Sequence, residues 1–147
     1  MATSTKQRVA WTVALVLWLC VVWGHSLVPA DESLQESSRF VVLLQTLVGR
    51  YVSLDEHLAT FIVRKTAHFS EYLALMVIAS KWAQSWWDRE RSRLATIAVW
   101  VLVPIVDEII QSFVPGRDMR LMDVCIDMAG GLVGMALVHG IASLRKR

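Results

Sequence analysis

The chain has 147 residues, which favours a single domain over residues 1–147, and its formal net charge is only +2. No basic stripe of the kind that binds nucleic acid is present. Hydrophobic residues make up 55% and charged residues 19%, so composition alone does not exclude a soluble protein. The distribution is more informative, because the apolar residues fall in long runs. Cys20 and Cys125 lie inside such runs without a CxxC neighbour, which indicates apolar packing.

The first apolar run covers residues 9–28. It carries no full charge, and its length suits a helix that spans hydrocarbon. Lys6 and Arg8 precede it, a pattern that is also typical of a signal peptide. However, the apolar core is long for a signal peptide, and Val28 and Ala30 form a mediocre cleavage site. We therefore predict a retained membrane anchor.

A more polar stretch follows, residues 29–57. Ser33 and Glu36 have the spacing of a capping box. Apolar residues then repeat at helical spacing on one face, over a length too short to span a membrane. These are Phe40, Leu43, Leu44, Leu47, Val48 and Tyr51. The pattern predicts an amphipathic helix, which could lie on the membrane surface or over the other helices.

Three further spans are predicted over residues 60–82, 94–114 and 123–144. With the first run they give an all-α, integral membrane four-helix bundle with an extracytoplasmic amphipathic helix between spans 1 and 2. In this arrangement one side collects most basic residues near the span ends, and we expect it to be cytoplasmic with both termini inside. These residues are Lys6, Arg8, Lys81, Arg89, Arg91, Arg93, Arg145, Lys146 and Arg147.

Charged and polar residues inside the last three spans are the most informative feature, because such residues are costly in hydrocarbon and are functional candidates. At 1.5 Å per residue, three helices place them in one layer just under the outer interface, with His68 and Glu71 roughly 10–15 Å and Asp107 and Glu108 roughly 10 Å below the outer ends of their spans. The layer contains His68, Glu71, Asp107, Glu108, Gln111, Asp123 and Asp127. Lys65, His68 and Tyr72 share one helix face. Gly130 and Gly134 have GxxxG spacing, which permits close helix packing.

Three interpretations of this layer compete. In the first, Lys65 and Arg117 neutralise acidic side chains (Glu71, Glu108 and Asp123) in a structural ion-pair network. In the second, the same two cations and His68 bind an anion or a lipid head group, helped by the backbone amides of the turn that contains Arg117. In the third, His68 and Glu71 act with Glu108 and Asp123 in acid–base catalysis or bind a divalent cation.

The third interpretation has weak support from spacing, since one histidine with scattered acids matches no standard metal signature. We therefore assign no metal ligand and leave the cofactor unknown and enzymatic activity open. His25, His57 and His139 are interpreted as interface or packing residues.

Two blocks in the second and third spans resemble the VanZ-like family. The first is K-T-A-H-F-S-E-Y (Lys65–Tyr72), and the second is D-E-I-I-Q-S-F-V-P-G-R (Asp107–Arg117). Asp123 and the later glycines continue the pattern, which covers roughly residues 61–138. The residues that match the family pattern are Lys65, His68, Tyr72, Asp107, Glu108, Gln111, Arg117 and Asp123. One departure is Asp127, where the pattern usually has Asn.

The resemblance implies a bacterial, multi-pass protein of the cytoplasmic membrane, in a family whose founding member assists glycopeptide resistance, chiefly towards teicoplanin. We predict a cell-envelope protein whose outer-leaflet site binds an anionic or lipid-linked ligand, such as a cell-wall precursor or a lipoglycopeptide. Catalytic candidates are His68, Glu71 and Glu108. Ligand-binding candidates are Lys65, Tyr72, Asp107, Gln111, Arg117, Asp123 and Asp127. A membrane hydrolase or transferase for a lipid-linked phosphate or glycan, and a scaffold for envelope proteins, are the alternatives.

Overall fold

The protein is all-helical throughout the part described by the computed structural model, residues 4–48 and 55–144. The helices are α1 (Thr5–Ser26), α2 (Ala30–Val48), α3 (Glu56–Trp86), α4 (Arg89–Gln111) and α5 (Leu121–Leu144). The predicted all-α class is therefore confirmed, with a helix at each expected segment. Tyr51 of the predicted amphipathic face and the basic residues Arg145, Lys146 and Arg147 lie outside the described residues.

Local sequence fixes several helix ends. The side chain of Ser4 accepts from the backbone N–H of Gln7 in a capping box at the start of α1. Two predicted spans, 9–28 and 94–114, run past the ends of their helices. Apolar residues continue up to Pro29 and Pro115, and each proline disfavours the helical conformation at the residue before it. Helix α4 nevertheless contains Pro104 and ends four residues before Pro115.

Three helices, α1, α4 and α5, are long and apolar enough to cross a membrane. Helix α3 has 31 residues, about 46 Å at the rise of an α-helix. It is thus long enough to span, but its first half carries Arg64, Lys65, His68 and Glu71. The helices support a membrane protein, while the role of α3 as a fourth span stays a prediction.

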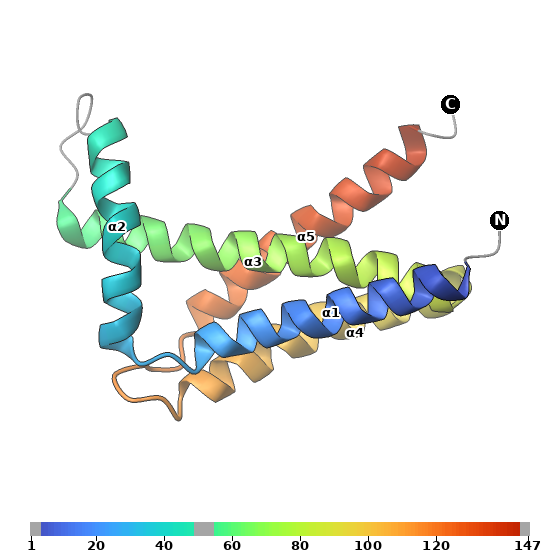
Figure 1. Ribbon diagram of the computed structural model, residues 1–147, viewed down its shortest axis with the longest axis horizontal. Coiled ribbons are helices and arrows are strands. Elements are labelled where there is room, and N and C mark those ends of the chain that lie inside the picture. Colours follow the sequence, from blue (N-terminus) through green and yellow to red (C-terminus); the bar gives the residue numbers. More distant parts are fainter. Residues whose placement is uncertain (1–3, 49–54, 145–147) are drawn as a thin grey trace.

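Helices α1, α3 and α4 run along the long axis of the molecule, and α2 crosses them at one end (Figure 1). The start of α1, the turn between α3 and α4 and the end of α5 lie at the opposite end. A buried apolar core joins α1, α3 and α4. Its fully buried members include Tyr72, Leu75, Met76 and Ala79, packed against Leu15, Val22 and Val103.

Helix α5 crosses α3 at very close range. A Cβ atom at Gly130 would clash with the carbonyl oxygen of Phe69, and one at Gly134 would clash with that of Leu73. Only glycine admits this approach of two backbones. The predicted packing role of the glycine pair is therefore confirmed, and it brings the first turns of α5 against the polar half of α3.

Candidate functional site

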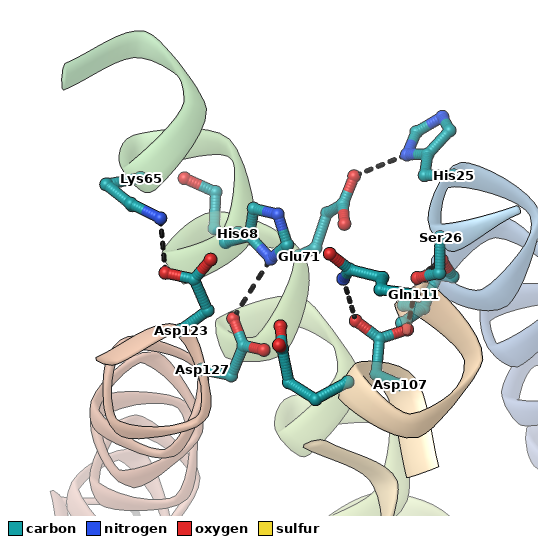
Figure 2. Close-up of polar contacts among 12 residues, drawn as sticks. His25, Ser26, Lys65, His68, Glu71, Asp107, Gln111, Asp123 and Asp127 are labelled. Carbon is teal, nitrogen blue, oxygen red and sulfur yellow. Dashed lines mark hydrogen bonds and ion pairs between the residues drawn. The ribbon is translucent and has the colours of Figure 1, made fainter. Parts of the chain in front are cut away.

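Side chains from four helices converge at the end of the molecule where α2 lies. Figure 2 shows α1, α3, α4 and α5 each contributing polar groups that point towards one another. The deepest are three carboxylates, Asp107, Glu108 and Asp127, which are exposed by 1%, 0% and 0%. Residues far apart in the sequence thus form one buried polar cluster.

The outermost pair in the cluster joins α3 to α5. The ammonium group of Lys65 donates to the carboxylate of Asp123 in the first turn of α5. Both side chains are largely buried, exposed by 17% and 10%. Asp123 also lies at a helix N-terminus, where negative charge is favoured.

Asp107 is oriented by two neutral donors. The hydroxyl of Ser26 at the end of α1 donates to its Oδ1 atom. The amide of Gln111, one turn further along α4, donates to Oδ2 at 3.1 Å. Asp107 therefore connects α1 to α4 without a basic partner.

Among the described residues, Asp127 has the imidazole of His68 as its one partner at ion-pair distance. Nδ1 of His68 lies 3.3 Å from Oδ1 of Asp127, outside hydrogen-bonding geometry. Both carboxylate oxygens of Asp127 are buried with no hydrogen-bond partner in the described part of the chain. Buried polar groups are nearly always satisfied, so two unpaired oxygens on one buried carboxylate need an explanation.

One carboxylate oxygen of Glu108 has a hydrogen-bond partner, and the other has none among the described residues. Its Oε2 atom accepts from the backbone N–H of Arg120 at 2.7 Å, which fastens the loop after α4. Its Oε1 atom and the hydroxyl of Tyr72 are buried without a hydrogen-bond partner in the described part of the chain. Unsatisfied groups thus gather around His68, Glu108 and Asp127.

Glu71 lies at the edge of the cluster and pairs with α1. Its Oε1 atom is 2.6 Å from Nδ1 of His25. Its backbone carbonyl accepts from the indole N–H of Trp18 at 3.0 Å. His25 was expected to be a packing or interface residue, and the structure shows in addition that it is a polar partner of the candidate site residue Glu71.

A cavity of about 660 Å³ opens beside the cluster, between α2, α3 and the end of α1. Its wall includes three arginines, Arg39, Arg64 and Arg117, from three different segments. The remaining lining residues are His25, Ser26, Ser33, Gln35, Glu36, Ser37, Phe40, Val63, Ala67, His68 and Glu71. His68 and Glu71 therefore belong both to the buried cluster and to the cavity wall.

Arg117 is held by backbone contacts and not by an acidic side chain. Its Nη2 atom donates to the carbonyl of His25 at 3.3 Å, and its Nε atom is buried without a partner. Gly116, at φ 75°, makes the preceding turn in a conformation that favours glycine. Burial, and then the positive charge of Arg64, lower the pKa of the Arg117 guanidinium.

The ion-pair network considered in the sequence analysis is realised only in part. Lys65 pairs with Asp123, but neither Lys65 nor Arg117 pairs with Glu71 or Glu108 among the described residues. The sequence had not predicted a role in the site for Arg39, Arg64, His25 and Ser26. Arg64 had an available signal, since it is a charge inside a predicted span.

One set of side chains has the geometry of a metal site. Single ligand atoms of His68, Asp107 and Asp127 all lie within 4.8 Å of one another. From the sequence, the residues expected beside His68 in a divalent-cation site were Glu71, Glu108 and Asp123. In the structure, Glu71 turns to α1 and Asp123 to Lys65.

Comparison with known proteins identifies the family. No curated protein and no solved structure matches the chain significantly. The family model described as VanZ/LLP1 matches residues 11–143, a range that contains all the residues of the cluster. The chain belongs to the VanZ/LLP1 family.

Proposed function

We propose that the chain is a multi-pass protein of the bacterial cytoplasmic membrane whose polar end binds an anionic, lipid-linked ligand at the outer face. The observation that carries this proposal is the cavity lined by Arg39, Arg64 and Arg117. Guanidinium groups bind phosphate and carboxylate through paired hydrogen bonds.

The charge of the cavity wall favours an anion. Three guanidinium groups face two carboxylates, those of Glu36 and Glu71. Glu71 is already engaged by His25, and Arg117 forms no ion pair within the described part of the chain. A bound anion would relieve the repulsion between Arg64 and Arg117.

The apolar part of the wall favours a ligand with a hydrocarbon chain. Phe40, Val63 and Ala67 line the same cavity as the arginines. A head group could thus contact the guanidinium groups while its chain follows α2 and α3 into the bilayer. A lipid-linked cell-wall precursor has this combination of groups.

The topology follows from the positions of the basic residues. The four-helix bundle would consist of α1, α3, α4 and α5, with α2 as the amphipathic helix on the surface. Lys6, Arg8 and Arg89 lie at the helix ends away from α2, so the positive-inside rule puts that end in the cytoplasm. The cavity then faces outwards.

Binding can be tested with farnesyl pyrophosphate as the anionic probe and farnesol as the uncharged control. The detergent-purified protein is titrated with each by isothermal titration calorimetry, for the wild type, Arg64→Ala and Arg117→Ala. We expect the wild type to bind only the pyrophosphate. Each variant should lose at least about tenfold in affinity, ~1.4 kcal/mol.

Arg91→Ala is the matched control, because Arg91 is an exposed arginine in the first turn of α4, away from the cavity. It should bind as the wild type does. Equal binding of farnesol, or unchanged affinity in both cavity variants, would contradict the proposal.

A membrane enzyme for lipid-linked phosphates is the second candidate. It is favoured by the contact between the cavity and the cluster: His68 and Glu71 line the cavity, and the buried Glu108 and Asp127 lie behind them. Glu108→Gln would then abolish phosphate release from farnesyl pyrophosphate while binding persists. Absence of phosphate release from the wild type would leave the binding function alone.

A contribution to teicoplanin resistance is the physiological extension of this proposal. Expression in a susceptible bacterium should raise the minimal inhibitory concentration of teicoplanin, and Arg117→Ala should abolish the effect at equal membrane abundance. If Arg117→Ala protects as well as the wild type, resistance does not depend on the cavity. Protection that requires a crosslinked partner protein would instead indicate a scaffold.

A further inference from the structure

We propose that His68, Asp107 and Asp127 bind one divalent transition-metal cation, at a site that adjoins the arginine-lined cavity through His68. It goes beyond the proposed anion binding and does not rest on it. The three side chains come from α3, α4 and α5, so an ion there would connect the three helices.

The geometry is close to that of a metal site. Ligand atoms bound to one ion at about 2.0–2.2 Å lie about 3–4.4 Å from each other. The three candidate atoms already lie within 4.8 Å of one another. Nδ1 of His68 and Oδ1 of Asp127 are 3.3 Å apart. A contraction of a few tenths of an ångström would complete the set.

Unsatisfied hydrogen-bonding capacity points to the same place. Asp127 is fully buried, and neither of its carboxylate oxygens has a hydrogen-bond partner among the described residues. Nδ1 of His68 is also buried and without a hydrogen bond. A cation between them would accept a lone pair from Asp127 and one from Nδ1 of His68.

The buried carboxylates favour a cation. No lysine or arginine in the described part of the chain forms an ion pair with Asp107, Glu108 or Asp127. Burying carboxylates without compensation costs several kcal/mol for each ion. Lys65 on α3 is engaged by Asp123.

A second layer of contacts orients one of the proposed ligands. Ser26 and Gln111 both donate to Asp107, in the way that outer hydrogen bonds commonly fix metal-binding carboxylates. His68 lines the cavity, which supplies an entry path for a hydrated ion. One imidazole nitrogen with two carboxylates suits Mn²⁺ or Zn²⁺ better than Mg²⁺, which prefers oxygen ligands alone.

The test uses the full-length protein in detergent, stripped with a chelator and then titrated with Mn²⁺ alone and with Zn²⁺ alone. We expect one ion per chain by elemental analysis after desalting. Electron spin echo spectroscopy of the Mn²⁺ form should detect one imidazole nitrogen. That readout requires no variant, so it stands even if a substitution prevents folding.

Variants then assign the ligands. His68→Gln and Asp127→Asn should each weaken binding by more than about a hundredfold, and Ser26→Ala by about 10–100-fold. Asp118→Asn is the matched control, because this aspartate is exposed in the loop between α4 and α5. It should bind the ion as the wild type does.

Any one of three results would overturn the proposal: the wild type binds neither ion, the bound Mn²⁺ carries no imidazole nitrogen, or Asp118→Asn loses the ion as completely as Asp127→Asn does. A wild type that binds farnesyl pyrophosphate but neither metal ion would overturn the metal site and leave the anion site standing.

Discussion

His25 and Glu71 join the end of α1 to α3 through a contact of 2.6 Å between side chains 46 residues apart. Both side chains line the cavity, and the carbonyl of His25 accepts from Arg117. The contact therefore positions one acidic group of the cavity wall and holds it away from a bound anion.

We expect His25→Ala to weaken binding of farnesyl pyrophosphate by up to about tenfold, because Glu71 loses its partner and its carboxylate repels the ligand. The double variant His25→Ala/Glu71→Gln should recover most of the affinity. His139→Ala serves as the control, since His139 is exposed and bonds within its own helix. Calorimetric titration measures all three, and a double variant as weak as the single one would exclude the electrostatic explanation.

The crossing of α3 and α5 predicts that alanine substitutions at different glycines of α5 differ sharply in their effect on stability. Gly130→Ala and Gly134→Ala should each destabilise the protein by about 1–3 kcal/mol, because backbone lies where the methyl group must go. Gly140→Ala has no atom within 4 Å of its new Cβ and should be neutral or slightly stabilising. Unfolding by dodecyl sulfate in mixed micelles gives the comparison. Equal stability of all three variants would show that the helices do not approach so closely.

The Lys65–Asp123 pair should matter far more than an exposed ion pair. Lys65→Met leaves a mostly buried carboxylate without a partner, and we expect a loss on the order of 3–5 kcal/mol. Lys65→Met/Asp123→Asn should be more stable than Lys65→Met alone, which is the signature of coupling. Arg91→Ala breaks the exposed Arg91–Asp88 pair and should change stability little. Additive losses in the double variant would mean that the pair does not interact.

The exposed apolar face of helix α2 predicts that this helix lies on the membrane surface with that face in lipid. Phe40, Leu43 and Leu47 are exposed by 62%, 54% and 64%, so none of the described residues covers their apolar face. Spin labels at positions 43 and 47, introduced as cysteines after replacement of Cys20 and Cys125, should be accessible to oxygen in liposomes. A label at Ser38 should instead be accessible to a water-soluble nickel chelate. Water accessibility at all three positions would contradict membrane contact.

Much of the site was within reach of sequence reasoning because depth in a membrane helix follows from position along the chain. His68, Asp107 and Asp127 were expected in one layer, and they do lie together. Their partners could not be predicted, since helix rotation and contacts between distant residues leave no local pattern. Asp107, for example, bonds to Ser26, 81 residues away.

The sequence by itself determined the elements of this protein. Long apolar runs mark α1, α4 and α5, Pro29 follows the end of α1, and glycines mark the face of α5 that packs on α3, because each depends on local backbone chemistry. The tertiary structure alone decided which polar groups meet. Close packing of α5 on α3 brings Asp127 to His68 and Asp123 to Lys65, while the end of α1 supplies Ser26 to Asp107 and His25 to Glu71. Among the described residues, those pairings leave Asp127 without a hydrogen bond and Arg117 without an acid, and both follow from the three-dimensional arrangement of helices distant in sequence.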